Sequence, residues 1–270
     1  MVHSKPLNHY AMKTNIILSL MFFCCNLHLS AQNDLLIGAW EANDGKQKEI
    51  KIYTPTHFML FIQNLEVDSL TTVGGGTYSA TANKLTENLM AVDYTSFLSE
   101  EEQYKKLKAE FDIKVEGDRF YQTGTLIISD TLQIPINHKF VRIKTNKSAP
   151  DNPALGAWNQ LSSSGTSSDG SNWSHTNATH TRFQLITPSH WIRTSATDKN
   201  FENLMGGSYT LEGNKMIAKL DFASFPLDGS VAEITQRVEG NKMYWSGIVK
   251  DKEGNQVMNF EDVFDKANAK

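Results

Sequence analysis

The sequence has almost no cysteine, and the little it has lies in a segment that we expect to be removed. Only two cysteines occur among 270 residues. They are Cys24 and Cys25, and both fall in an apolar run near the N-terminus. The rest of the chain can therefore form neither a disulfide nor a thiolate metal site. Its stability must come from packed cores, and thiol catalysis is excluded.

Other signals of function are also missing. No apolar run reaches the roughly 20 residues that a membrane-spanning helix requires. The chain carries 26 basic and 30 acidic residues without a basic stripe, so nucleic acid is not an expected partner. A nucleophile elbow, a phosphate-binding loop, a dinucleotide fingerprint and a calcium-binding loop are all absent. Since the histidines match no zinc pattern either, we expect neither a metal nor a cofactor.

The first 31 residues are typical of a secretory signal peptide. A short basic region at residues 12–13 precedes an apolar run at residues 16–25, and small residues follow up to Ala31. Cleavage is expected after Ala31, and Met12 fits the pattern better than Met1 as the true start. Bulky phenylalanines precede the two cysteines, which disfavours a lipoprotein anchor. The pattern predicts an exported protein, either periplasmic or secreted.

An internal repeat organises the remainder of the chain. The recurring segments are a Gly-Ala-Trp triplet, a Thr-Pro-x-His turn followed by an aromatic residue, a Gly-Gly-x-Tyr segment, and a Val-Glu-Gly turn before a tyrosine. Their order is the same in both copies, which chance matching rarely produces, so the pattern predicts two copies of one domain. In the two copies these segments begin at residues 38 and 156, 54 and 187, 75 and 206, and 115 and 238.

The domain boundaries follow from this repeat. The first domain is expected over residues 33–145 and the second over residues 154–270, with a polar, proline-containing linker at 146–153 between them. The second copy gains a Ser/Gly-rich run at residues 162–172, and the first gains residues near 99–108. Insertions confined to loops are typical of two copies of one fold.

Each copy reads as a series of short strands. In residues 111–116 apolar and charged side chains alternate, which predicts a half-buried strand. Gly117 and Asp118 then predict a hairpin turn. Many such strands between turns favour an all-β barrel or sandwich. One short helix is also expected in the first copy, because Ser99 and Glu102 form a capping box. Its apolar face would comprise Tyr104, Leu107 and Phe111.

The order of the motifs resembles the small lipocalin-like (calycin-type) domains of secreted bacterial proteins. Those domains open on Gly-x-Trp, continue through Thr-Pro-x-His and Gly-Gly-x-Tyr, and end on a hairpin. The resemblance covers nearly all of the chain after the signal, once per copy. It implies two tandem small antiparallel lipocalin-like β-barrels, with Trp40 and Trp158 packed across their closed ends. The function of such domains is largely unknown.

Glu87 is the most informative single residue. It has the same parity as Leu85 and Leu89, which places it on the apolar face of the strand expected at residues 84–92. An inward carboxylate is costly unless it is paired or hydrogen-bonded, and the resemblance suggests an acid that faces the cavity. In the second copy the equivalent residue is Ala218. A slip of the strand register, or a position at the barrel mouth, explains Glu87 equally well.

Two further residue types recur in both copies. His57 and His190 each follow the Thr-Pro turn, where a structural hydrogen-bonding role is favoured. If His57 and Glu87 faced one cavity, they could orient a ligand or act as acid and base. Tyr121 and Tyr244 begin the closing hairpin, where packing is the simplest interpretation. The candidate ligand-binding residues are Glu87, His57, Tyr121 and Trp40, with Trp158, His190 and Tyr244 as their structural equivalents.

The second copy has a different set of aromatic and histidine residues. His175 and His180 lie near its insertion and are interpreted as incidental loop residues. Trp173, Trp191 and Trp245 are mostly expected in the core. Trp173, however, lies in a polar segment and could stack on a sugar or another ring.

Three functions are compatible with these observations. The expected one is a non-catalytic protein that binds a small apolar or sugar-like ligand in the first barrel, near Glu87 and His57. The second is a hydrolase- or isomerase-type enzyme that uses the Glu87–His57 pair, although no nucleophile motif accompanies it. The third is a structural or partner-binding accessory protein with filled barrels. The first copy is the expected binding site because it retains the inward acid.

Overall fold

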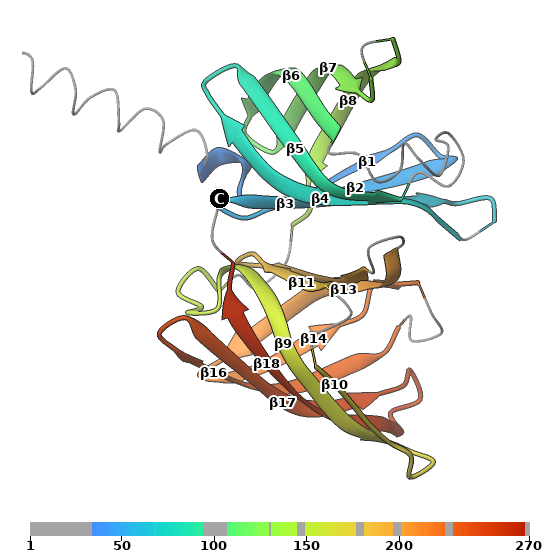
Figure 1. Cartoon of the computed structure of the whole chain (residues 1–270), viewed down its shortest axis with the longest axis vertical. Coiled ribbons are helices and arrows are strands. Elements are labelled where there is room, and N and C mark those ends of the chain that lie inside the picture. The colour runs from blue at the N-terminus through green and yellow to red at the C-terminus, as the bar shows by residue number, and fades with distance from the viewer. Residues whose placement is uncertain are drawn as a thin grey trace, which may run out of the picture.

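The computed structural model describes residues 34–67, 69–93, 107–129, 131–144, 149–176, 181–196, 201–224 and 229–267. The expected signal peptide lies outside these residues. The chain is all-β and forms two tandem closed antiparallel barrels (Figure 1). None of the helices in the described part of the chain has the length and apolar character needed to cross a membrane.

The first barrel is a meander in which each strand pairs with the next and β8 returns to β1. A short helix at residues 34–36 precedes it. Alternating burial along β6 and β7 directs one face of each strand into the core. The strands are β1 (Gly38–Asn43), β2 (Gln47–Tyr53), β3 (His57–Asn64), β4 (Ser69–Ala80), β5 (Lys84–Asp93), β6 (Leu107–Glu116), β7 (Arg119–Ile127) and β8 (Gln133–Arg142).

The second barrel repeats this arrangement and is closed by the pairing of β18 with β9. Two short strands lie off its eight-stranded circuit, because β10 pairs with β9 and β15 pairs with β13. The strands are β9 (Gly156–Ser167), β10 (Asn172–Thr176), β11 (Thr181–Ile186), β12 (His190–Ala196), β13 (Phe201–Glu212), β14 (Lys215–Lys219), β15 (Phe222–Ala223), β16 (Val231–Glu239), β17 (Lys242–Lys250) and β18 (Gln256–Lys266).

A buried tryptophan occupies the same place in the first strand of each barrel. The indole N–H of Trp40 donates to the carbonyl four residues earlier at 2.7 Å, and Trp158 makes the same bond at 2.7 Å. A cation from the last strand covers each ring. The guanidinium carbon of Arg142 lies 4.0 Å from the Trp40 ring centre, and Lys266 Nζ lies 4.3 Å from that of Trp158. These paired contacts confirm that the repeat is structural.

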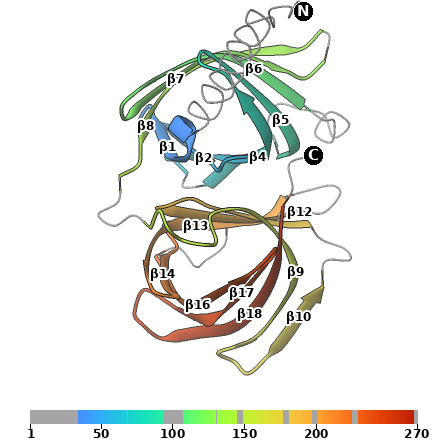
Figure 2. The same ribbon diagram turned by 90° about the vertical axis from the view of Figure 1, so that its left-hand side faces the viewer.

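The two barrels pack together through the outer faces of their sheets (Figure 2). Residues at equivalent positions meet in this interface, such as Ile52 from β2 and Leu185 from β11. The rings of Phe61 and Phe222 lie 4.2 Å apart. The buried cluster between the barrels comprises Ala39, Ile50, Ile52, Met59, Phe61, Ala157, Leu185, Ile192, Leu204 and Phe222.

The helix predicted after Ser99 is wrong in its C-terminal part. Residues 94–106 lie outside the described residues, but Leu107 and Phe111 belong to strand β6 and are buried in the barrel core. Apolar and charged residues alternate from Leu107 onward, and this period of two favours a strand over a helix. The short helix in the first barrel lies at residues 34–36 instead.

The Ser/Gly-rich run at residues 162–172 is also not a loop. Its first six residues extend β9, which pairs there with β10 on one side and β18 on the other. Small serine side chains suit a strand that has neighbours along both edges. The insertion therefore adds a hairpin to the second barrel, and this hairpin contributes to the site described below.

The predicted linker packs partly onto the second barrel. Within its described residues, 149–153, Asn152 is 4% exposed. The Asn152 side chain donates to the Tyr209 hydroxyl at 3.0 Å and accepts from Gln236 Nε2 at 2.7 Å. These bonds anchor the start of the second barrel to its own core.

Candidate functional site

Glu87 lies inside the first barrel, as its parity with the apolar residues predicts. It is 1% exposed, and its neighbours across the sheet are Tyr78 on β4 and Ala109 on β6. Both of these residues belong to the barrel core. The register slip considered above is therefore excluded.

The Glu87 carboxylate is fully engaged by two neighbours on β2. Lys51 Nζ lies 3.2 Å from each carboxylate oxygen, and the Tyr53 hydroxyl donates to Oε1 at 2.5 Å. Lys51 also donates to Gln122 Oε1 at 3.0 Å. Burial, with Glu87 as the next cause, raises the pKa of Tyr53 well above its ordinary value. The acid is thus held by an internal ion pair, which explains its burial without a ligand.

His57 points away from this cluster. Its neighbours in the chain, Phe58 and Leu60, lie in the core of the first barrel, whereas the His57 ring contacts Phe183 of the second barrel at 5.1 Å between ring centres. Glu87 and His57 therefore lie on opposite faces of the first barrel's sheet. The structure does not bring together the pair on which the enzyme hypothesis depends.

The Thr-Pro-x-His segment forms the same turn in both barrels. Thr54 Oγ1 donates to the His57 carbonyl at 3.0 Å, and Thr187 Oγ1 bonds to that of His190 at the same distance. Each imidazole Nδ1 lies 2.8 Å from the preceding hydroxyl. Burial lowers the pKa of His57, and it lowers that of His190 to about 4 against a smaller opposite effect of Asp221. Both histidines serve the turn.

The two repeated tyrosines lie on the outer faces of their barrels. In β7 the buried positions alternate with Tyr121, and Lys139 Nζ lies 5.8 Å from the centre of its ring. In β17 Tyr244 occupies the equivalent position, with the Arg237 guanidinium 4.2 Å from its ring. Tyr121 is therefore not part of the interior around Glu87. Of the four residues predicted to bind a ligand, only Glu87 and Trp40 have buried side chains that face inside the first barrel.

The second barrel replaces the whole buried polar cluster, not only its acid. Ala218 pairs with Tyr209 and Ala232, as Glu87 pairs with Tyr78 and Ala109, so the predicted equivalence of Glu87 and Ala218 is confirmed. The same strand registers relate the other members of the cluster. Lys51 corresponds to Gln184, Tyr53 to Ile186, and Gln122 to Trp245.

A cavity of about 360 Å³ lies in the second barrel. Its apolar wall combines aliphatic side chains with the rings of Trp191 and Trp245, and its polar side contains amides, hydroxyls and charges. The lining residues are Gln160, Ser163, Trp173, His175, Arg182, Trp191, Arg193, Thr194, Ser195, Asn203, Met205, Leu220, Ala232, Ile234, Trp245, Val249, Met258, Phe260 and Asp262.

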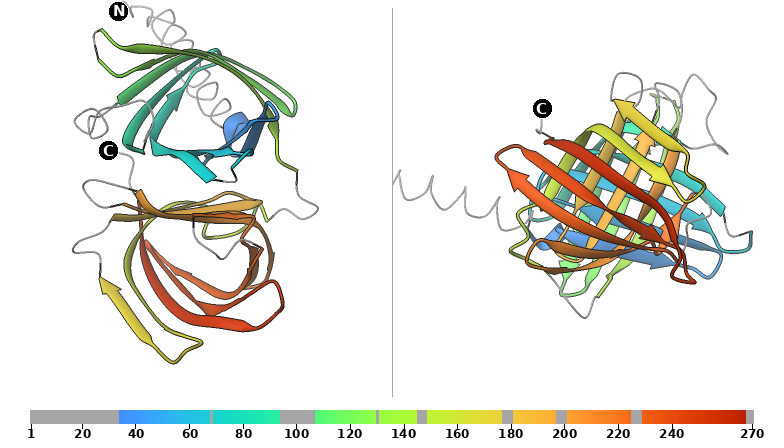
Figure 3. Two further views of the ribbon diagram at one scale, coloured as in Figure 1. Left: turned by 90° about the vertical axis from the view of Figure 1, so that its right-hand side faces the viewer. Right: turned by 90° about the horizontal axis from the view of Figure 1, so that it is seen from below.

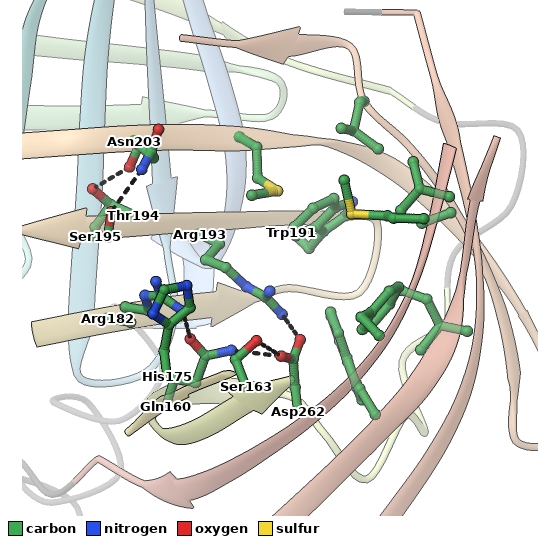
Figure 4. A pocket seen from close by; sticks show the side chains of 18 of the residues that line it. Gln160, Ser163, His175, Arg182, Trp191, Arg193, Thr194, Ser195, Asn203 and Asp262 are labelled. Atoms are coloured by element: carbon green, nitrogen blue, oxygen red, sulfur yellow. Dashed lines mark hydrogen bonds and ion pairs between the residues drawn. The ribbon is translucent and has the colours of Figure 1, made fainter. Parts of the chain in front are cut away.

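Asp262 is the centre of the polar side of this cavity (Figure 4). Its Oδ1 accepts from Gln160 Nε2 at 2.8 Å and from the Ser163 hydroxyl. Its Oδ2 forms an ion pair with Arg193 Nη2 at 2.9 Å. Arg193 also donates to Gln184 Oε1 at 2.9 Å, so the guanidinium is held from two sides. A paired carboxylate and guanidinium thus face one cavity.

The aromatic wall includes a buried donor without a partner. Trp191 is 3% exposed, and its indole N–H has no hydrogen-bond partner among the described residues. Its ring centre lies 6.1 Å from that of Trp245. A buried polar group without a partner is costly; the Trp191 side chain lines the cavity, whereas its N–H is buried.

The position of Asp262 in the sequence also indicates an inward acid. In β18 Asp262 has the same parity as the buried Phe260 and Phe264, which is the criterion that singled out Glu87. Arg193 likewise takes the place of the inward Leu60 in the first barrel. Neither residue was predicted, because the inward Glu87 placed the expected site in the first barrel. In the described part of the chain, no cluster of histidine, cysteine or acidic residues fits a metal ion.

Comparisons with known proteins do not identify the chain. No protein-family model matches it, and no curated protein does. A matching solved structure is a protein of unknown function of the DUF3598 family from Nostoc punctiforme, with a TM-score of 0.26, 10% identity, and coverage of 86% of this chain and 97% of that chain. The DNA polymerase III β chain from Streptococcus pneumoniae has a TM-score of 0.14 and 7% identity, with 87% and 58% covered. Scores this low do not show a shared fold.

Proposed function

We propose that this protein is a non-catalytic binder of a small, mostly apolar ligand held inside the second barrel. The observation that carries the proposal is the cavity of about 360 Å³, lined by aliphatic and aromatic side chains and by the Arg193–Asp262 pair. This volume falls within the roughly 300–1,000 Å³ of typical small-molecule sites. The sequence favoured the first barrel, where the internal Lys51 pair already satisfies Glu87.

The chemistry of the cavity supports binding more than catalysis. Asp262 is bonded to both Arg193 and Gln160, and a few well-placed polar groups of this kind fix the orientation of a bound molecule. Aliphatic and aromatic side chains supply the remaining surface, which favours an apolar ligand body.

We also propose that the two barrels are related to lipocalin-like domains and that the protein is exported. The meander order of the strands and the buried tryptophan in the first strand of each barrel support the relationship. The basic, apolar and small-residue pattern before Gln32 supports export. Mass spectrometry of the protein expressed with its leader in a Gram-negative host should find a mature chain that begins at Gln32 in the periplasm or medium. An uncleaved chain in the cytoplasm would contradict export.

Binding can be measured with N-phenylnaphthylamine, a neutral apolar fluorophore, through energy transfer from tryptophan. We expect saturable binding to one site. Ala232 lines the cavity and Ala109 is its equivalent in the first barrel, so Ala232→Met and Ala109→Met form a matched pair. Filling the cavity with Ala232→Met should weaken binding about tenfold or more, whereas Ala109→Met should leave it unchanged.

The thermal melts of both variants verify that they fold. Loss of binding in Ala109→Met alone would move the site to the first barrel. Non-saturable binding of the probe, or equal affinity in both folded variants and the unmodified chain, would refute a binding cavity in either barrel.

A further inference from the structure

We infer that the ligand of the second barrel is an amphiphile whose polar end is a neutral hydroxylated ring, as in an alkyl glycoside. The ring would stack on Trp173 beside the Asp262–Arg193 pair, and the apolar part would enter the barrel. This inference rests on the proposed function, because it assigns a chemical class to the molecule in the same cavity.

The first observation is an aromatic platform at the margin of the cavity. Trp173 lies on β10, the short strand added along β9 (the yellow arrow in Figure 3). A Cβ at Gly165 would lie 2.6 Å from the Trp173 ring. The glycine therefore lets the indole lie close against β9, while the ring also lines the cavity. The His175 ring lies nearby, with 5.8 Å between ring centres. The face of an indole is a suitable surface for the apolar face of a sugar ring.

The second observation is the balance of charge beside this platform. Asp262 is a carboxylate acceptor, and Arg193 is a cationic donor paired with it at 2.9 Å. A hydroxyl group both donates and accepts hydrogen bonds, so it complements such a pair. A carboxylate ligand would meet Asp262, and an ammonium ligand would meet Arg193. The Ser163 hydroxyl already donates to Asp262, which shows the kind of contact that the carboxylate accepts.

The third observation is a set of neutral polar groups on the same cavity wall. Asn203 Nδ2 donates to Ser195 Oγ at 3.3 Å, and Thr194 Oγ1 donates to the Asn203 carbonyl at 3.1 Å. Ser195, Asn203 and Gln160 line the cavity, whereas the Thr194 side chain shares the parity of Ile192 and Thr194 pairs with Leu204 of the interface between the barrels. Amides and hydroxyls in such number match several ligand hydroxyls better than they match one charged group.

The fourth observation is the separation of polar and apolar lining along the strands. Apart from Leu220, which follows β14, the aliphatic side chains come from β13 and β16–β18, whereas most polar ones other than Asp262 come from β9 to β12. A molecule that contacts both sets needs a hydroxylated end and an apolar end. The apolar lining comprises Met205, Leu220, Ala232, Ile234, Val249, Met258 and Phe260.

Three ligands with one chain and different heads test the inference. Octyl glucoside, octanoate and octyltrimethylammonium, each below its micellar concentration, would compete with N-phenylnaphthylamine on the full chain. We expect the glucoside to bind about tenfold more tightly than either charged ligand. Trp173→Ala should remove this preference, whereas Tyr121→Ala, which alters an aromatic residue on the outer face of the first barrel, should keep it.

A second variant, Asp262→Asn, distinguishes the loss of a ligand contact from the loss of the fold. It keeps the side-chain shape and removes the negative charge, so the affinity for octanoate should rise while that for the glucoside falls. Octanoate as the tightest ligand, equal affinity for all three heads, or a preference unaffected by Trp173→Ala would overturn the inference. In each of these cases saturable binding of the fluorophore would still support the proposed function, and its absence would count against the proposed function itself.

Discussion

In each barrel an inward carboxylate is paired with a lysine or arginine from another strand. In the first barrel Lys51 holds Glu87, with 3% and 2% of the two side chains exposed. In the second, Arg193 holds Asp262, with 14% and 1% exposed. The first pair is enclosed by the rings of Phe111 and Phe140 and is part of the core. The second pair lines an open cavity, where Arg193 is the more accessible of its two members.

The first prediction concerns the buried pair. Glu87→Ala should lower the free energy of unfolding by about 3–5 kcal/mol, because it leaves the Lys51 cation buried without its counter-ion. The double variant Lys51→Met with Glu87→Leu replaces the pair by apolar groups and should recover most of this loss. Urea denaturation of the full chain measures both. If Glu87→Ala is as stable as the unmodified chain, then Lys51 either finds another partner or is uncharged in the folded variant.

At the scale of elements, the Thr-Pro-x-His turn is the best preserved unit of the repeat. In each barrel the turn threonine bonds to the histidine backbone, and a core tyrosine hydroxyl donates to the threonine carbonyl at 2.7 Å. The histidine side chain lies beside the interface between the barrels in the first copy. These contacts explain why the motif recurs in the second copy, where Ala218 stands in place of Glu87.

The second prediction is a pH dependence that originates in this turn. The pKa of His190 is about 4 in the folded chain against an ordinary value of 6.5, so below pH 6.5 the unfolded state binds the extra proton. The stabilisation from neutral His190 is full above pH 6.5 and is lost as the pH falls towards 4, by about 3 kcal/mol in total.

Denaturant titrations between pH 7 and pH 4 measure this loss. His190→Gln should flatten the profile. His57→Gln should flatten it further, because the pKa of His57 is lowered in the same direction. A stability profile that is the same with and without His190 would contradict the assignment.

At the scale of the whole molecule, two copies of one barrel have different interiors. Their outer faces form a shared apolar interface in which equivalent positions meet. Strand β12 contributes to both the interface and the cavity, because Ile192 faces the first barrel and Arg193 faces the cavity. The first barrel therefore supports the wall on which the proposed site is built.

The third prediction concerns this interface. Ile52 is fully buried between the barrels, so Ile52→Lys would place an unpaired charge there and should separate the two barrels. Calorimetry should then resolve two unfolding transitions, and small-angle scattering should give a larger radius of gyration. Val141→Lys is the matched control, because Val141 is 51% exposed on β8. Should Ile52→Lys keep one transition and the original radius, the interface would not be what holds the barrels together.

Much of this arrangement could be predicted from local patterns. The alternation around Phe111, the hairpin at Gly117 and the repeated motifs predict two all-β domains, because a strand's period and a turn's chemistry are set by neighbouring residues. The inward orientation of Glu87 follows from the same parity rule. The helix predicted after Ser99 is wrong from Leu107 onward, because these residues form a strand that pairs with β5 and β7.

What the sequence by itself determined is the repeat, the strand pattern and the side of each strand that faces inward. Only the tertiary structure decided that Lys51 neutralises Glu87, that His57 faces the other barrel, and that the cavity lies beside Asp262. The physical reason is that each of these depends on strands far apart in the chain. Whether an inward acid is matched by a cation or left beside open space is a property of the closed barrel, which no single strand encodes.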